Sequence, residues 1–187
     1  EQEQNQLKTA QEQKKCAVQQ DTGMQPAKIA FAGNLNKSEF LKSIPFSKDM
    51  GLEMHLWGKL EDKKKEELPS VCEYHGVLKA VEVPTAVCTM DYGLVWDGTG
   101  KDEIEGGLGE YLKYNNSHKC GLYLASGIPA IVWKHSGMAA FIKEHECGIV
   151  IERLSELPGK IKQADYEQLK KNALLVSNQL QQGHYLK

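Results

Sequence analysis

Long hydrophobic runs, a strong net charge and a regular cysteine pattern are all missing from this chain of 187 residues. No apolar run reaches the roughly 20 residues that a membrane-spanning helix needs, and we expect no signal peptide. A net charge of −2 gives no reason to expect a nucleic acid as partner. The five cysteines, an odd number at scattered positions, argue against a disulfide framework and favour a reducing compartment. We therefore expect a cytoplasmic protein.

Two nucleotide-binding motifs are missing as well. A dinucleotide-binding enzyme carries Gly-x-Gly-x-x-Gly after its first strand, whereas the first strand here leads into AGNLNKS. That segment is not a P-loop either, because the glycine before Lys-Ser is absent.

Cys72 and His75 have the two-residue spacing of a zinc site, but no second pair lies nearby in the sequence. We therefore expect no metal site.

The chain does show alternating strand and helix patterns. Short apolar runs bounded by glycine or polar residues predict strands at 28–32, 51–57, 71–74, 87–96, 130–133 and 148–151. Between and after them, helical patterns predict helices that begin near Phe40 and lie at 78–83, 136–146 and 165–182, with a helical turn at 155–158. Strands and helices that alternate at this spacing predict an α/β fold with a parallel sheet and helices on both faces.

The remaining segments differ in composition from this α/β region. Residues 1–27 are dominated by Gln, Glu and Lys, which predicts a linker or a solvated helix before a folded unit at 28–187. Residues 97–115 contain several glycines and no clear pattern, so we expect a flexible lid or connector there. The chain begins at Glu1 rather than Met, and we expect it to be a fragment of a longer protein.

The segment 109–133 suggests an anion site at the start of a helix. Asn116 or Ser117 can cap this helix, and Gly127 can end it in a left-handed conformation. His118 and Lys119 then fall in the first turn, where the helix dipole disfavours cations by roughly 0.3–1 kcal/mol each. A bound phosphate would reverse that effect, because free N–H groups and two basic side chains would meet one anion. The alternative is that Lys119 only extends into solvent.

A second turn of this kind follows the first predicted strand. Gly33 ends the strand, and Asn36 with Glu39 has the spacing of a capping box at a helix start. The turn is either a phosphate site or an ordinary strand-to-helix connection. Both turns lie at strand-to-helix junctions. In a parallel sheet such junctions face the same edge, which is where these sheets bind their ligands, so the two turns could bind one ligand. This argument predicts a compound with a nucleotide diphosphate as the ligand.

Several segments resemble a known family. They are GNLNKSEFL (33–41), YHG (74–76), DYGLVWDG (91–98), GEYLKYNNSHK (109–119) and LYLASGIPAIVWKHSGMAAFI (122–142). They look like the carboxy-terminal half of bacterial GT-B glycosyltransferases related to the glucosyltransferases of serine-rich adhesin glycosylation and to β-1,6-galactofuranosyltransferases. The resemblance implies one half of a GT-B fold, with 28–187 as a Rossmann-like domain that binds a nucleotide-sugar.

The resemblance also implies where the donor would bind. The implied phosphate contacts are Gly33, Asn34 and Lys37, and the implied base contacts are Tyr74, His75 and Gly76. The implied contacts to the ribose and diphosphate are Asn115, Asn116 and Lys119, and Tyr114 and His118 are counted with the same donor site. The paired glutamates of the wider GT-B pattern are absent, since Tyr114 and Leu122 stand in their places. A carboxylate contact to the ribose is therefore not implied, and no catalytic residue can be assigned.

The implied reaction transfers a hexosyl group from a UDP-sugar to a glycan or glycoprotein acceptor, which a separate N-terminal domain would bind. Lys119, Lys37 and the two helix starts would then stabilise the departing diphosphate without a metal or other cofactor. The lack of an Asp-x-Asp motif agrees with that. Two other functions stay open, another Rossmann-like nucleotide-binding enzyme and a non-catalytic binding module. Assembly into a homo-oligomer also stays open.

Overall fold

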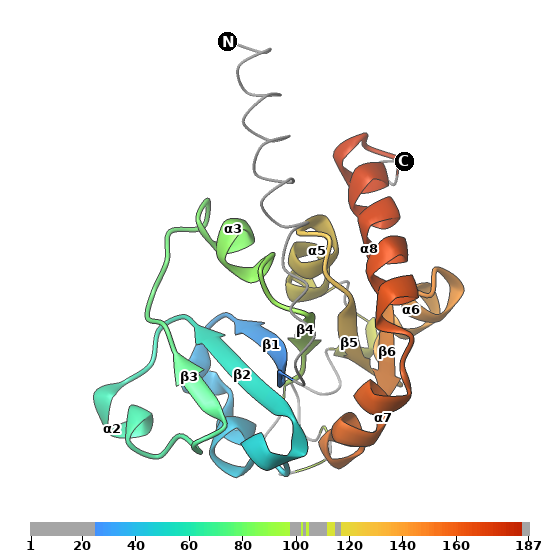
Figure 1. The fold of residues 1–187 in the computed structure, drawn as a ribbon. Helices are drawn as coiled ribbons and strands as arrows, with labels where there is room; N and C mark the ends of the chain where they lie inside the picture. The colour runs from blue at the N-terminus through green and yellow to red at the C-terminus, as the bar shows by residue number, and fades with distance from the viewer. Residues whose placement is uncertain (1–24, 98–101, 103, 105–111, 115–116, 185–187) are drawn as a thin grey trace.

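The fold is built on one parallel sheet (Figure 1). The computed structural model describes residues 25–97, 102, 104, 112–114 and 117–184. Six strands lie in the order β3-β2-β1-β4-β5-β6, and every neighbouring pair is parallel. Their bounds are β1 Ala27–Ala32, β2 Leu52–Trp57, β3 Cys72–Tyr74, β4 Tyr92–Val95, β5 Ala130–Trp133 and β6 Gly148–Ile151. This is the doubly wound order, with its switch point between β1 and β4. The predicted Rossmann-like α/β class is confirmed.

Helical segments cover both faces of the sheet (Figure 1). Phe31 points to one face and packs edge-on against Phe40, with ring centroids 5.2 Å apart. Gly93 pairs in register with Ala30 and so faces the other side, where it lies against the ring of Tyr123. The α-helices are α2 Asp62–Lys65, α3 Val83–Val87, α5 His118–Ala125, α6 Ala139–Glu144, α7 Leu157–Gln163 and α8 Tyr166–Gln181. The 3-10 helices are η1 Leu35–Lys37, η2 Glu39–Ser43, η3 Lys48–Met50 and η4 Leu154–Glu156.

The central strands form the hydrophobic core. All four residues of β4 and all four of β5 are buried, as expected for parallel strands covered on both faces. The long C-terminal helix α8 packs against α5, and the Ser177 hydroxyl donates a 2.7 Å hydrogen bond to the Ala125 carbonyl. Ala173 and Val176 are buried in that contact, whereas Leu175 on the same helix is exposed. Helix α8 therefore buries one apolar face.

Two elements between β3 and β4 differ from the sequence prediction. The helix expected at 78–83 is not formed, and α3 begins at Val83, where that helix was expected to stop. Pro84 explains the difference, because the fixed φ of proline and its missing N–H suit the first turn of a helix. Residues 87–90 end α3 in a turn rather than forming a strand.

The capping box expected after Gly33 is also wrong. Two short 3-10 helices replace the predicted helix, and Ser38, not Asn36, precedes the second one. The Asn36 side chain instead accepts a 3.0 Å hydrogen bond from the backbone N–H of Glu61. Glu39 pairs with Lys64 at 2.8 Å. These contacts to the segment around α2 use the polar groups that a local cap would have needed.

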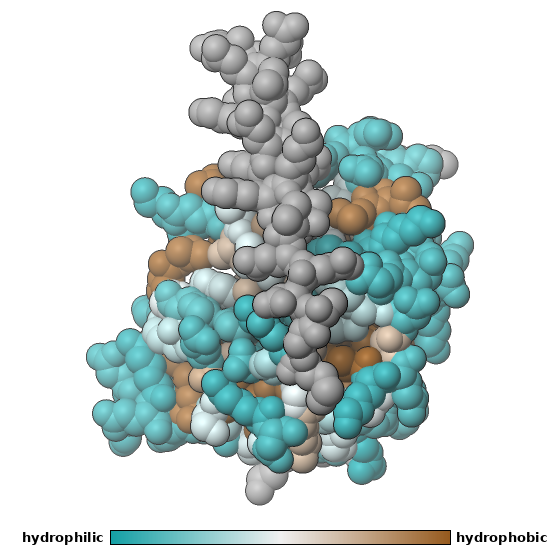
Figure 2. Space-filling model, in the orientation of Figure 1, coloured by the Kyte–Doolittle hydropathy of each residue, from teal (hydrophilic) through white to brown (hydrophobic). Residues whose placement is uncertain are grey.

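The surface in Figure 2 is largely hydrophilic on the visible face, with apolar surface over the connection from β3 to α3. That connection carries Val77 and Val81, which are 68% and 81% exposed.

In the described part of the chain, no helix is long and apolar enough to cross a membrane. The expected linker lies outside the described residues up to position 24, and most of the expected lid does so too.

Three cysteines, Cys72, Cys120 and Cys147, carry free thiols, and Cys88 is disulfide-bonded. One bonded cysteine among the described residues is not a disulfide framework. It does, however, weaken the cysteine argument for a reducing compartment, and the cytoplasmic location stays a prediction.

Candidate functional site

The polar edge of the sheet lies where β1 and β4 end side by side. These two strands flank the switch point, which is where doubly wound sheets bind ligands. Helix α5 follows β4 in the chain and begins at this edge. Its first turn has no acidic residue, and its N-cap Ser117 makes no side-chain cap hydrogen bond. Among the described residues no side chain caps this helix start, so its first backbone N–H groups can bind an anion.

Lys119 is the basic group at this edge. Its ammonium lies 4.3 Å from the centroid of the Phe31 ring and 3.3 and 3.4 Å from the two carboxylate oxygens of Asp97. The side chain passes so close to Gly33 that an added Cβ there would lie 3.2 Å from the Lys119 Cε. Lys119 thus folds back over the end of β1, and the prediction that it only extends into solvent is not met. Its side chain is 19% exposed.

The charge of Lys119 is only partly compensated. Burial lowers the pKa of its ammonium, while the nearby Asp97 carboxylate acts in the opposite direction. An ammonium has three N–H donors, and the two carboxylate contacts are both longer than a strong charge-assisted hydrogen bond. A second anion would therefore compensate more of the charge of the Lys119 ammonium. The uncapped start of α5 lies beside this ammonium.

Three glycines hold the adjacent strand ends together. Gly33, Gly58 and Gly76 follow β1, β2 and β3, and all three have positive φ. Gly33 N–H donates to the Trp57 carbonyl at 2.9 Å, and Gly58 N–H donates to the Gly76 carbonyl at 2.8 Å. A Cβ on Gly58 would lie only 1.7 Å from the Gly33 carbonyl oxygen. This edge therefore depends on a close backbone approach that only glycine allows.

Tyr123 fixes α5 against the end of β1. Its buried hydroxyl accepts a 3.0 Å hydrogen bond from the backbone N–H of Ala32, one residue before Gly33. Burial raises the pKa of this hydroxyl well above its usual range, so it stays protonated. Lys119 lies one helical turn earlier, so the same contact helps to place it.

Replacement of Tyr123 by Phe should therefore lower the free energy of unfolding by about 1–3 kcal/mol, the cost of leaving a buried N–H without a partner. Urea unfolding monitored by circular dichroism measures this loss. A Tyr114→Phe variant is the control, because the side chain of Tyr114 is 87% exposed and its hydroxyl is not buried. A loss no larger than in the control would contradict the role of the hydroxyl.

The other predicted phosphate contacts are more exposed. The Asn34 side chain accepts a 3.2 Å hydrogen bond from the N–H of Asn36, and Lys37 is exposed on η1. Because η1 is a three-residue 3-10 helix, this junction lacks the helix dipole that the sequence suggested. Tyr114 is 87% exposed, and His118 is exposed at the first position of α5. Asn115 and Asn116 lie outside the described residues.

The predicted base contacts divide between the two faces of the sheet. Tyr74 pairs in register with Leu56, and its hydroxyl donates a 2.9 Å hydrogen bond to the Gly58 carbonyl. His75 follows on the other face, where its ring stacks on Trp57 with 4.7 Å between centroids. Of the three residues, Tyr74 and Gly76 both bind the backbone of Gly58, and His75 belongs to a different cluster.

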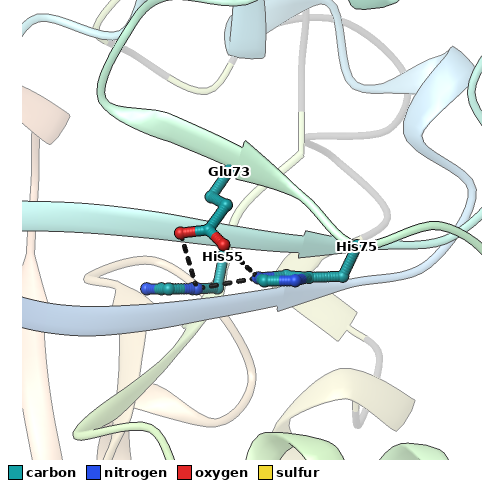
Figure 3. Close-up of side chains that lie close together, drawn as sticks. All are labelled: His55, Glu73 and His75. Atoms are coloured by element: carbon teal, nitrogen blue, oxygen red, sulfur yellow. Dashed lines mark hydrogen bonds and ion pairs between the residues drawn. The ribbon is translucent and has the colours of Figure 1, made fainter.

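That cluster contains His55, Glu73 and His75 (Figure 3). The Nδ1 of His55 and the Nε2 of His75 are 2.8 Å apart, and the two rings are nearly coplanar, with 6° between them. One carboxylate oxygen of Glu73 lies 3.8 Å from His55 Nδ1, and the other lies 3.9 Å from His75 Nε2. Burial lowers the pKa of His55, so its ring is neutral at neutral pH.

Sequence reasoning missed two residues of these groups, Asp97 and His55. Asp97 falls in the segment expected to be a lid or connector, and His55 falls inside the predicted strand at 51–57. Asp97 lies two residues after β4, which becomes the neighbour of β1 only through the strand order. His55 meets Glu73 only through the register of β2 with β3. Alternation along β2 was the one available signal for His55, because it puts His55 and Trp57 on the same face.

Comparison with known proteins matches residues 29–187 to the family described as "Glucosyltransferase 3-like, C-terminal domain". The β-1,6-galactofuranosyltransferase WbbI of Escherichia coli is 32% identical over 101 residues, which are 52% of this chain and 31% of that protein. Glucosyltransferase 3 of Streptococcus gordonii is 28% identical over 163 residues, 86% of this chain and 46% of that protein. The chain spans less than half the length of these relatives.

Solved structures resemble the chain in fold. The glycosyltransferase SnogD from Streptomyces nogalater has a TM-score of 0.53 at 18% identity, covering 88% of this chain and 43% of its own. WaaG, a glycosyltransferase of lipopolysaccharide biosynthesis, has a TM-score of 0.52 at 15% identity, covering 90% and 45%. Both are GT-B glycosyltransferases, and both match the chain over less than half of their length.

Proposed function

Because this chain belongs to the glucosyltransferase 3-like family and matches its C-terminal domain over residues 29–187, we propose that it is the donor-binding half of a glycosyltransferase. The proposed donor is a UDP-sugar. The proposed reaction transfers its hexosyl group to a glycan or glycoprotein acceptor, which a domain outside this chain would bind.

The position of Lys119 is the observation that carries this proposal. Its ammonium lies at the switch-point edge of the sheet, beside Gly33 and at the open start of α5. A diphosphate there would receive hydrogen bonds from the ammonium and from the first backbone N–H groups of α5. Gly33 has no side chain to block the approach of the phosphates to the end of β1.

The proposed mechanism is electrostatic. As the bond between the sugar and the diphosphate breaks, negative charge grows on the leaving oxygen. Lys119 and the α5 N–H groups would stabilise that charge in place, without reorganising during the reaction. Lys37 would contribute from η1 as a flexible cation. The 3-10 geometry of η1 removes the second helix dipole that the sequence suggested.

A second candidate function is another nucleotide-binding enzyme with this fold, since doubly wound sheets bind many nucleotides at the same edge. Titration calorimetry of this chain with UDP, NAD and AMP separates the two candidates. Our proposal predicts saturable binding of UDP and much weaker binding of NAD and AMP. Preference for NAD or AMP would favour the second candidate.

The chain on its own should bind UDP or a UDP-sugar and transfer nothing to an acceptor. Much of the rate of a two-substrate reaction comes from holding both reactants in one geometry, and we propose that the acceptor binds elsewhere. The measurement combines calorimetry with a radiolabelled-sugar transfer assay on the same preparation. Robust transfer by the 187-residue chain would show that the proposed division into two halves is wrong.

A further inference from the structure

We propose that His55, Glu73 and His75 form a binding site for a divalent transition metal, with Zn²⁺ as the expected ion. This site is separate from the Lys119 edge and goes beyond the proposed function. It also departs from the sequence-based expectation of no metal site. The ligand atoms would be His55 Nδ1, His75 Nε2 and one oxygen of Glu73 (Figure 3).

The distances between these atoms fit one metal ion. Zn–N and Zn–O bonds of about 2.0–2.1 Å in a tetrahedral site place neighbouring ligand atoms roughly 3.3 Å apart. The two ring nitrogens are 2.8 Å apart, and with one oxygen of Glu73 all three ligand atoms lie within 4.8 Å of one another. Turning the two imidazoles slightly apart and the exposed Glu73 side chain inward brings the three atoms to that geometry. Two histidines and one glutamate also form a known zinc ligand set that leaves a fourth position open.

The surroundings of His55 resemble those of a metal-bound histidine. Metal-bound histidines usually donate their other ring N–H to a carboxylate or carbonyl, which fixes the tautomer. The Nε2 of His55 is buried and has no hydrogen-bond partner among the residues that the structure describes, yet a carboxylate oxygen of Glu53 lies 3.7 Å away. If Nδ1 binds a metal, Nε2 must carry the proton and face Glu53. A metal on Nδ1 would therefore make Nε2 a hydrogen-bond donor to Glu53, and Nε2 is the ring nitrogen of His55 that is otherwise without a partner among the described residues.

The ligands come from rigid parts of the fold. His55 lies in β2, and Glu73 pairs with it in register on β3, so both side chains leave the same face of the sheet. The His55 side chain is only 8% exposed, and the His75 ring is held by its stacking on Trp57. A site whose ligands are held before the metal arrives loses little conformational entropy on binding.

Cys72 is not part of the proposed site, although its spacing from His75 first suggested zinc. Cys72 pairs in register with Met54 and therefore points to the opposite face from Glu73. The second histidine comes instead from β2, twenty residues earlier in the chain.

Titration calorimetry with ZnCl₂, on chain first treated with a chelator, tests the proposal. We expect one ion per chain with micromolar or tighter affinity, together with a rise in melting temperature, because the ion binds the folded state. Glu73→Gln and His75→Gln should each abolish this binding. Glu53→Ala should weaken it about tenfold to a hundredfold, as loss of a carboxylate behind a ligating histidine does.

His184→Gln is the matched control, because it removes an exposed histidine at the end of α8, on another part of the chain. It should keep the binding of the parent. Glu73 is exposed, so its variant should fold, and circular dichroism checks that. Zinc binding that is absent in the parent, or unchanged in Glu73→Gln, would overturn the proposal. Lys119→Ala should bind zinc like the parent, so a failure of the UDP proposal does not affect this test.

Discussion

Replacement of Lys119 by Ala should weaken UDP binding about tenfold to a hundredfold or more. A hydrogen bond to a charged group is worth about 1.5–3 kcal/mol, and each 1.4 kcal/mol corresponds to about a factor of ten in affinity. Lys119 is the partly buried cation beside Gly33, so no solvent-exposed lysine is expected to replace it. Titration calorimetry with UDP measures the loss.

Two comparisons separate a phosphate contact from general damage. Uridine lacks phosphates and should bind the parent and Lys119→Ala equally well. The double variant Lys119→Ala/Asp97→Asn removes the carboxylate that the single variant leaves without its cation. If the single variant fails only because Asp97 then repels the diphosphate, the double variant should recover the affinity of the parent. We expect it to stay weak, because the contact itself is lost.

The ion pair also changes the expected stability of the variant. The helix dipole by itself favours a slightly more stable empty fold in Lys119→Ala, because a cation in the first turn of a helix is unfavourable. In the structure Lys119 is paired with Asp97, whose side chain is only 26% exposed, so the variant leaves a partly buried carboxylate unpaired. We therefore expect no gain in stability. UDP affinity equal to that of the parent would contradict the anion site.

Replacement of Gly58 by Ala should lower the free energy of unfolding by about 2–6 kcal/mol. The Cβ would lie 1.7 Å from the carbonyl oxygen of Gly33, so the ends of β1 and β2 would have to move apart. Overpacking of this kind costs about 1–3 kcal/mol, and an L residue at a φ of +141° adds about 1–3 kcal/mol of strain. Urea unfolding monitored by circular dichroism gives the change in midpoint.

Gly51→Ala is the matched control for this variant. Gly51 also has a positive φ, +79°, but an added Cβ would meet no atom within 4 Å. Its free energy of unfolding should fall only by the cost of the backbone strain, about 1–2 kcal/mol. The difference between the two variants then isolates the close approach between Gly58 and Gly33. Equal losses would show that the two strand ends are not held as closely as described.

The parts that the sequence predicts well are governed by neighbouring residues. The strand at 130–133 has the predicted bounds, because its run of four apolar residues is bounded by Pro129 and Lys134. Gly127 ends α5 with a φ of +69°, as its position before Pro129 suggested. Lys119 lies in the first turn of α5, as predicted. Each of these features follows from residues that begin or end a helix or strand within a few positions in the sequence.

The parts that the sequence misses depend on contacts between distant segments. The Asn36 side chain accepts a hydrogen bond from the backbone N–H of Glu61 instead of capping a helix. No local sequence pattern predicts this contact. Asp97 reaches Lys119 because β4 lies beside β1, and His55 meets His75 because β2 lies beside β3. The ion pair and the histidine cluster therefore require the strand order and the register, which periodicity alone does not provide.

The central claim is that this domain binds the diphosphate of a nucleotide-sugar at the start of α5. A crystal structure of the chain with UDP tests it most directly. We predict that the diphosphate lies between Gly33 and the first turn of α5, with the Lys119 ammonium within hydrogen-bond distance of a phosphate oxygen. UDP bound elsewhere on the sheet, or bound at this edge with its phosphates directed away from Lys119, would contradict the account.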